Sequence, residues 1–590
     1  MQQKYKYLSP FDFCFFFCRT CELLLETMMR SELINVNQII QSGIILLNLF
    51  NIKTTSNMQS KSKYILVIGI ILNTCFALSL KAQSSSDGAQ KFKTVLDYID
   101  YYYADSTKSK KLVEDAIVGM LETLDPHSVY IPKEDLEETN EPLTGNFEGV
   151  GIQFNLLFDT ITVISPISGG PSEKVGIISG DKIIKINGKN FAGMKIKNDD
   201  VIKNLRGPKG TQVTVSILRR GVKELLDFTI VRDKIPLYSI DATYMATPTV
   251  GYIKLSRFAQ TSMDEFMQSI TTLKAQGAKD LILDLNDNGG GYLNIAFEIA
   301  DQFLSADKMI VYTEGLKSPK KEYKATARGV FEKGRVVVLV DEGSASASEI
   351  VSGALQDWDR ALLIGRRTFG KGLVQNQFNL PDGSAMRLTI ARYYTPVGRC
   401  IQKPYDGKIE DYYKDFSNRF KHGELTNPDS IKFPDSLKYM TPNKKIVYGG
   451  GGIMPDIFIP LDTTKSSVYY TNLIRKGVVN QFTLSYLDKH RKELFAAYPT
   501  FTDFKKNFSI SDEIMNELIG AGEKENVKKD EKALTVSGSI IRLQMKALLA
   551  RDLWKNDSYY EIMNDVNDAY TKTLQVLKNN SFSKYKISTY

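Results

Sequence analysis

The chain has 590 residues, of which 43% are hydrophobic and 24% charged, and its formal net charge is +8 at pH 7. This length exceeds what one hydrophobic core holds, so we expect three or four domains. The composition is that of a globular protein. Because the positive charge is spread along the whole chain, we expect no nucleic-acid-binding surface.

The amino-terminal region predicts export. Residues 1–57 fit no domain pattern, whereas residues 58–82 have the organisation of a secretory signal that begins at Met58. Two lysines precede an apolar run over 64–80, and a cleavage position follows before Gln83. We therefore expect an exported, periplasmic protein. The alternative is an uncleaved segment that holds the protein at the inner membrane, because the apolar run is only slightly shorter than a membrane span.

After this signal, residues 89–144 predict a helical domain, since apolar residues recur at intervals of three and four. Asp125-Pro126 ends the pattern, because proline disfavours the helical conformation of the residue before it. His127 follows directly. No neighbouring residue in the sequence makes it a base, so we interpret His127 as structural rather than catalytic.

Residues 145–233 predict a small, mostly β domain. Strand patterns alternate with two short helices, and Asn187-Gly188 is a strong hairpin signal. The order of elements, with GDKIIKING at 180–188, resembles a PDZ domain. The resemblance implies that a peptide adds as a strand and that its carboxylate binds backbone N–H groups of one loop; a small barrel without a ligand is the alternative. The loop consists of Gly149, Val150, Gly151 and Ile152.

Residues 234–465 predict an α/β core. A strand at 250–255, a helix at 263–275 and a strand at 281–285 follow one another, which implies a parallel or mixed sheet covered on both faces. The run NDNGGG after the second strand lacks the GK[ST] of a phosphate loop.

The segment 341–375 carries the candidate chemistry. The buried-strand pattern of 335–340 leads into serines and then into a helical pattern, and Ser346 with Glu349 matches a capping box. Ser346 is therefore expected at a helix start, where free N–H groups and the helix dipole stabilise an oxyanion. The alternative is that Ser346 only caps this helix.

Lys371 is the candidate base. It is flanked by glycines within apolar sequence, and a desolvated lysine activates a serine hydroxyl because burial disfavours the ammonium form. Lowering a lysine pKa from about 10.4 to about 7.5 takes roughly 4 kcal/mol, which requires a largely dry pocket. Gln375 shares a face with Lys371 in either a strand or a helix, so its amide is a candidate to orient the amine.

Neither a histidine base nor a metal ion is expected. The histidines stand outside any nucleophile–base motif; they are His127, His422 and His490. No cluster of His, Cys and Glu has metal-ligand spacing, so the sequence predicts no metal and no cofactor.

Three strings resemble the signature of the carboxy-terminal processing (tail-specific) proteases, which are serine endopeptidases with a Ser/Lys dyad: SASASEI, GALQD and TFGKGLVQ. In that family the nucleophile precedes the lysine by 25 positions, and here 371 minus 346 is 25. This spacing selects Ser346 over Ser344 and Ser348. The resemblance thus implies Ser346 as nucleophile, Lys371 as general base and Gln375 as the residue that orients the base.

The same resemblance extends to the glycine run. The family has DLRxNPGG where this chain has DLNDNGGG, so Asn286 replaces an arginine and Gly289 a proline. The resemblance implies an oxyanion site formed by the backbone N–H groups of Gly290 and Ala347. The strings LDPHS and YGGGGI extend it to about 89–460, with the carboxy-terminal segment outside.

The resemblance implies a multi-domain α/β protein with a crotonase/ClpP-like α/β protease core. The expected regions are a helical domain at 89–144, an inserted, mostly β PDZ domain at 145–233, the core at 234–465 and a helical region at 466–590. We expect an exported serine endopeptidase that forms an acyl-enzyme and selects protein substrates by exposed carboxy-terminal tails. The alternatives are a catalytically inactive PDZ peptide-binding adaptor and a crotonase-type acyl-transfer enzyme.

Overall fold

The computed structural model describes residues 87–157, 159–167, 169–178, 180–219, 221–405, 409–579 and 581–588. The amino-terminal extension expected at 1–57 and the signal expected at 58–82 lie outside these residues. The described residues fall into two units, divided between Ser109 and Lys110. In the first unit, the described residues contain a helix over 87–102.

The region expected to be a helical domain also contributes a strand. After the helix over 87–102 it contains α4 (Ser109–Glu122) and α5 (Lys133–Thr144), and β1 (Val129–Ile131) lies between these two. β1 pairs antiparallel with β18 (Ala385–Tyr394), far along the chain. The Asp125-Pro126 break therefore redirects the chain into a sheet of the core.

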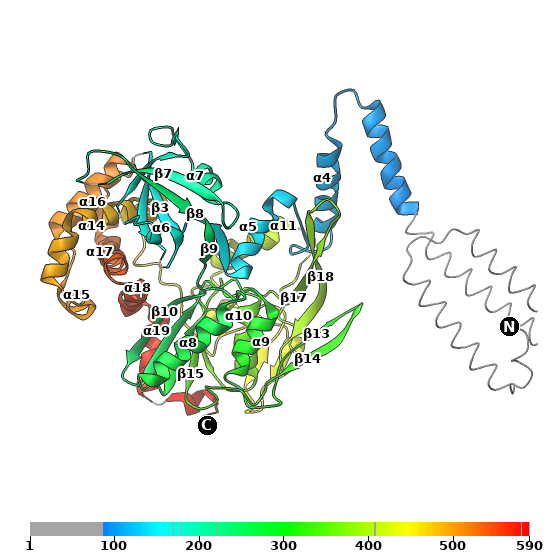
Figure 1. Cartoon of the computed structure of the whole chain (residues 1–590). Helices are drawn as coiled ribbons and strands as arrows, with labels where there is room; N and C mark the ends of the chain where they lie inside the picture. Colours follow the sequence, from blue (N-terminus) through cyan, green and yellow to red (C-terminus); the bar gives the residue numbers. More distant parts are fainter. Residues whose placement is uncertain are drawn as a thin grey trace, which may run out of the picture. The chain divides into compact units, whose positions relative to one another are not determined.

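The PDZ region is an antiparallel sheet with two short helices (Figure 1). Its strand order is β3 (Ile152–Leu157), β4 (Thr160–Pro166), β5 (Lys182–Ile186), β7 (Gln212–Leu218) and β8 (Leu226–Val231), with β6 (Lys189–Asn190) on β5 and helices α6 (Pro171–Lys174) and α7 (Asn198–Leu205). Asn187 and Gly188 both have positive φ, as the predicted β5–β6 hairpin requires.

Two short strands join this region to the core. β2 (Asn146–Gly149) enters the PDZ region, β9 (Asp233–Pro236) leaves it, and the two pair antiparallel. The PDZ sheet is therefore inserted into the core at one paired connection.

The core is built on a six-stranded sheet. Its order is β10 (Ile240–Thr247), β11 (Val250–Leu255), β12 (Asp280–Asp284), β15 (Val336–Val340), β16 (Leu362–Gly365) and β21 (Ile457–Phe458). β10 is antiparallel to β11 and the other neighbours are parallel. Every residue of β11, β12 and β15 is buried, because both faces are covered.

Helices cover the two faces of this sheet (Figure 1). One face packs against α8 (Ser262–Ala275), α9 (Leu293–Asp301) and α10 (Ala347–Asp357). The other packs against α19 (Asp568–Lys578) and η4 (Ser581–Tyr585), from the carboxy-terminal segment.

A second sheet lies beside the site. Its order is β1, β18, β13 (Met309–Gly315) and β14 (Ser318–Lys324), and β17 (Leu373–Asn379) also pairs with β18. Between β18 and β21 the chain is rich in loops. Its short elements there are α11 (Ile409–Tyr413), α12 (Asp415–Lys421), η1 (Pro428–Ser430), η2 (Asp435–Leu437), β19 (Lys438–Met440) and β20 (Ile446–Tyr448).

The carboxy-terminal segment is helical and belongs to the second unit. Its remaining elements are α13 (Val468–Arg475), α14 (Val478–Ala497), α15 (Phe501–Asn507), α16 (Asp512–Lys524), α17 (Glu531–Leu553), α18 (Asn556–Met563) and η3 (Asn564–Val566), packed around a hydrophobic core of their own. α18 contacts β10, where the Thr243 N–H donates to Asp557 at 2.9 Å. The segment therefore supports the six-stranded sheet as well as its own core.

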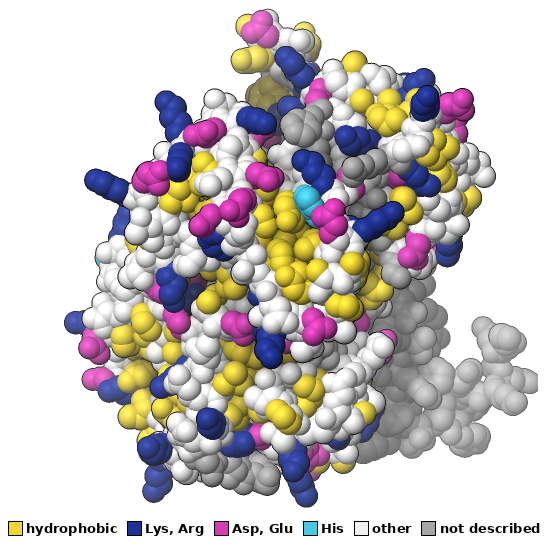
Figure 2. All heavy atoms as spheres, turned by 90° about the vertical axis from the view of Figure 1, so that its left-hand side faces the viewer, with side chains coloured by type: hydrophobic (Ala, Val, Ile, Leu, Met, Phe, Trp, Pro, Cys, Tyr) yellow, Lys and Arg dark blue, Asp and Glu magenta, His cyan; other side chains and the backbone are white. Residues whose placement is uncertain are grey.

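The face shown in Figure 2 carries basic and acidic side chains in alternation, with hydrophobic side chains gathered between them. Within the described residues, no helix is both long and apolar enough to span a bilayer.

Candidate active site

The nucleophile candidate lies at a strained turn between β15 and α10. Ser346 is the N-cap residue of α10 and has φ 56° and ψ −112°. A residue other than glycine at positive φ is uncommon, and such strain concentrates at functional sites. Ser346 is partly exposed, whereas its neighbours Ala345 and Ala347 are buried. The turn thus presents one serine at the surface of a buried loop.

The other two serines of the cluster have structural roles. The Ser344 hydroxyl donates to the Leu285 carbonyl oxygen, and the Ser348 hydroxyl donates to the Asn288 carbonyl oxygen, both at 2.8 Å. Both serines are fully buried. Of the three, Ser346 is the one that a substrate can reach.

Glu349 joins the turn at Ser346, the serine turn, to the loop 368–371 that carries Lys371, the lysine loop. Its Oε2 accepts the N–H groups of Ser346 and Lys371, each at 2.9 Å. Its Oε1 accepts the Thr368 hydroxyl at 2.5 Å and the Gly370 N–H at 2.8 Å. Burial raises the pKa of Glu349 to about 7, against the opposing effect of these four donors. The sequence identified Glu349 only as a capping residue, because its contacts with 368–371 are long-range.

The environment of Lys371 favours a neutral amine. Lys371 lies two residues before β17 and is partly buried, and desolvation, followed by the nearby charge of Arg387, lowers its pKa. In the described part of the chain, no hydrogen bond joins Ser346 Oγ to Lys371 Nζ. The structure therefore brings the two backbones together at Glu349 without showing the proton-transfer contact.

Gln375 lies on β17, and its amide donates to Thr389 rather than to Lys371. Its Nε2 donates to the Thr389 hydroxyl at 3.1 Å, across the β17–β18 pair. A β-bulge between Val374 and Gln375 interrupts the alternation that places Gln375 on the face of Lys371. Its predicted orientation of the amine stays a prediction.

His127 lies close to Lys371, which the sequence did not indicate. Its Nε2 is 2.8 Å from the Tyr412 hydroxyl, and its backbone N–H donates to Asp125. Burial, then the charge of Lys371, lowers the pKa of His127 to about 4. A neutral, hydrogen-bonded histidine agrees with a structural role. In the sequence, the LDPHS string was the one signal that this segment belongs with the site. The strand β1, which follows the string, pairs with β18.

Gly290 lies against the nucleophile turn. A Cβ on Gly290 would lie 2.8 Å from the Ser346 Cβ and 2.9 Å from the Ala347 nitrogen, and its φ is +99°. Only glycine fits this approach. Its N–H donates to Asn288 Oδ1 at 2.9 Å, so this predicted oxyanion donor already has an acceptor. The Ala347 N–H, by contrast, has no acceptor among the described residues.

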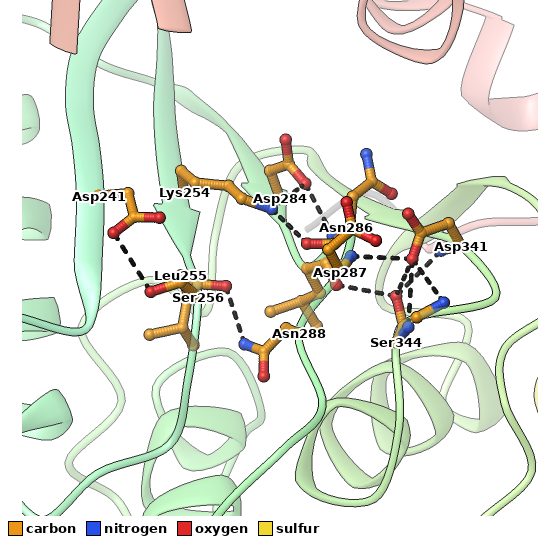
Figure 3. Close-up of polar contacts among 12 residues, drawn as sticks. Asp241, Lys254, Leu255, Ser256, Asp284, Asn286, Asp287, Asn288, Asp341 and Ser344 are labelled. Carbon is orange, nitrogen blue, oxygen red and sulfur yellow. Dashed lines mark hydrogen bonds and ion pairs between the residues drawn. The ribbon is translucent and has the colours of Figure 1, made fainter. Parts of the chain in front are cut away.

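Residues 286–288, which precede Gly290 in its loop, are held by hydrogen bonds to neighbouring strands and loops (Figure 3). Lys254 Nζ lies 3.2 Å from Asp284 Oδ1 and also donates to the Asn286 carbonyl. These contacts place a lysine cation beside Asp284 in a chain where Asn286 replaces the family's arginine. Further along, Asn288 Nδ2 donates to the Leu255 carbonyl at 2.8 Å, and the Asp287 N–H donates to Asp341 at 2.9 Å.

The predicted carboxylate loop has free donors. Gly151 has φ +73°, and the carbonyl groups of Val150 and Gly151 accept hydrogen bonds from Ser172 and Ile167. The N–H groups of Val150 and Gly151 have no acceptor within the described residues. The adjoining β3 is an edge strand of the PDZ sheet. The loop and edge therefore offer hydrogen-bonding groups of the kind a peptide terminus uses.

Metal ligands do not gather in the part of the chain that the structure describes. No group of three or more His, Cys, Asp or Glu side chains there is arranged to hold a metal ion.

Comparison with known proteins decides the family. Peptidase family S41 matches residues 249–413, a PDZ domain matches 149–230, and the activating protease CtpB N-terminal domain matches 74–135. The chain is 35% identical over 347 residues to the carboxy-terminal-processing protease of Bartonella bacilliformis, covering 57% of this chain and 79% of that relative. The chain belongs to the carboxy-terminal processing proteases of peptidase family S41.

The chain is also similar to a second relative and to a solved structure. The carboxy-terminal processing protease CtpA of Bacillus subtilis is 34% identical over 386 residues, covering 62% of this chain and 82% of that relative. The solved structure of a photosystem II D1 C-terminal processing protease is 29% identical and covers 53% of this chain and 89% of its own, with a TM-score of 0.31. The predicted fold class, an α/β protease core with a PDZ domain, is confirmed, and this S41 protease is a serine peptidase. Residues 469–555 match a family of unknown function.

Proposed function

We propose that this S41 protease is an exported endopeptidase that cleaves proteins selected by their carboxy-terminal tails, through an acyl-enzyme on Ser346 with Lys371 as general base. The observation that supports the dyad most directly is the shared carboxylate. Glu349 Oε2 accepts the N–H groups of both residues at 2.9 Å, so residues far apart in the sequence meet at one buried group.

The proposed chemistry uses a neutral lysine. Ser346 Oγ attacks the scissile carbonyl carbon while Lys371 Nζ takes the hydroxyl proton, and the resulting ammonium protonates the leaving amine. Water then attacks the ester by the same route and releases the new carboxyl terminus. Because burial lowers the Lys371 pKa, the reactive form is populated at lower pH than for a solvated lysine. The free Ala347 N–H at the start of α10 is placed to stabilise the oxyanion.

Tail selection is the first test of this proposal. A free-acid substrate tail is expected to give a KM about tenfold lower or more than the same tail amidated, because amidation removes the charge that the Val150 and Gly151 N–H groups would bind. Steady-state kinetics on the matched pair measure the difference. Short peptides that do not reach the PDZ sheet are expected to be cleaved alike in both forms.

A pair of glycine variants locates the effect. Gly151→Ala is expected to abolish the preference, since its φ is +73° and a Cβ would lie 2.9 Å from Ile235 Cδ1. Gly210→Ala is the matched control, because its φ is also positive but its Cβ direction is open. Equal cleavage of free-acid and amidated tails by the unmodified protein would rule out carboxylate recognition. Tail binding without cleavage would indicate an adaptor instead.

Export is tested at the amino terminus. We expect the mature protein to begin at Gln83 when it is isolated from the periplasm, because the apolar run at 64–80 and the residues after it match a signal with its cleavage position. Amino-terminal sequencing after cell fractionation measures this. A chain that still carries the apolar run in the membrane fraction would support the anchored alternative, and a cytoplasmic chain would contradict export.

A further inference from the structure

Tyr393, like Glu349, contacts both residues of the proposed dyad. It lies near the end of β18 and is 1% exposed. Its hydroxyl lies 3.1 Å from the carbonyl oxygen of Ser346 and also donates to the carbonyl oxygen of Lys371. Its backbone N–H donates to the Gly372 carbonyl at 2.9 Å. One tyrosine therefore touches the serine turn and the lysine loop together.

Glu349 and Tyr393 make complementary contacts with the same two residues. Glu349 accepts their N–H groups, and the Tyr393 hydroxyl meets their carbonyl oxygens. A phenol has one proton, so it donates to one carbonyl at a time or shares the proton between both. Either arrangement keeps both carbonyl oxygens beside the same hydroxyl, and thereby fixes the distance between the backbones at Ser346 and Lys371.

We propose that Tyr393 is a positioning residue that sets the separation of Ser346 and Lys371, so that serine hydroxyl and lysine amine meet when substrate binds. This inference rests on the proposed Ser346–Lys371 mechanism and adds to it a residue that no sequence motif indicated. The hydroxyl stays a donor at every working pH, because burial, then Glu349, raises the pKa of Tyr393. The ring itself is held in the hydrophobic core of the sheet.

The test is Tyr393→Phe, which removes only the hydroxyl. We expect kcat on a tailed substrate to fall about 100-fold with KM within about twofold, because a small misplacement of reacting groups costs about that much in rate. We also expect the pH–rate profile to shift upward, since a loosened lysine loop admits water and returns the Lys371 pKa toward its ordinary value. A residue that only supports the fold would not move this pH profile.

Tyr394→Phe is the matched control. Tyr394 is the next residue on β18, and its ring stacks on Tyr312 at 4.8 Å, a contact that phenylalanine keeps. We expect unchanged kcat and pH profile for this variant. A third variant, with 3-fluorotyrosine at position 393, keeps the hydroxyl and is expected to retain kcat within about twofold, because the positioning contact survives.

Three outcomes would overturn the assignment. They are a Tyr393→Phe protein with unchanged kcat and pH profile, a 3-fluorotyrosine protein that loses as much kcat as the Phe variant, and a Phe variant that fails to fold while the 3-fluorotyrosine variant folds. The last would make the hydroxyl a support of the fold. Failure of the dyad itself is distinguishable, because Lys371→Ala would then keep its activity whatever Tyr393→Phe does.

Discussion

Replacing Ser346 or Lys371 by alanine is expected to abolish proteolysis while the protein stays folded. The first substitution removes the nucleophile and the second removes its base, so each should lower kcat by at least about 10⁴-fold, as in other nucleophile–base pairs. The double variant should lose no more than either single one, because the two residues act as a unit. Cleavage of a tailed substrate, with circular dichroism as the check on folding, measures this.

Ser352→Ala provides the control for these variants. Ser352 lies on the same helix α10, and its hydroxyl donates to the Ser348 carbonyl at 2.8 Å, away from the lysine loop. It should keep kcat within about threefold, since the loss of one helix-internal side-chain hydrogen bond changes stability by about 1 kcal/mol. A Lys371→Ala protein with near wild-type turnover would show that another group is the base.

Glu349→Gln is expected to have the second largest effect, on both stability and activity. The buried carboxylate accepts four donors, two at each oxygen. A glutamine offers one oxygen, and its NH₂ group would face two donors without an acceptor between them. We expect a loss of about 2–4 kcal/mol in the free energy of unfolding and about 100-fold in kcat.

Chemical denaturation and steady-state kinetics on the same Glu349→Gln sample measure the two effects. Glu410→Gln is the control, since the Glu410 side chain is exposed and pairs only with Lys414 among the described residues. Its stability and kcat should both stay near wild type. If Glu349→Gln kept full kcat, the carboxylate would not be what holds the serine turn to the lysine loop.

Local signals in the sequence predicted much of the fold. Val336–Val340 reads as a buried strand because every position is apolar, and both faces of β15 are covered. Asn187-Gly188 predicted a hairpin because a tight turn needs positive φ, which both residues adopt. The spacing of Ser346 and Lys371 predicted a shared site, and their backbones meet at Glu349.

Long-range contacts could not be predicted in this way. β1 pairs with β18, and His127 meets Tyr412, across more than 250 residues in each case. The helical pattern of α19 shows that one face is buried, but it does not show that the partner is the catalytic sheet. The bulge beside Gln375 and the acceptor of the Gly290 N–H depend on neighbours that no motif specifies.

Mapping the covalent intermediate tests directly whether Ser346 and Lys371 act as nucleophile and base. The protein is treated with an acylating β-lactone at a series of pH values, and the modified residue and its rate of formation are found by mass spectrometry of peptides. We expect an ester on Ser346 whose formation accelerates as pH rises through a pKa below that of an ordinary lysine, and which forms far more slowly in Lys371→Ala. An adduct on another residue, or an Ser346 adduct that forms equally fast without Lys371, would contradict it.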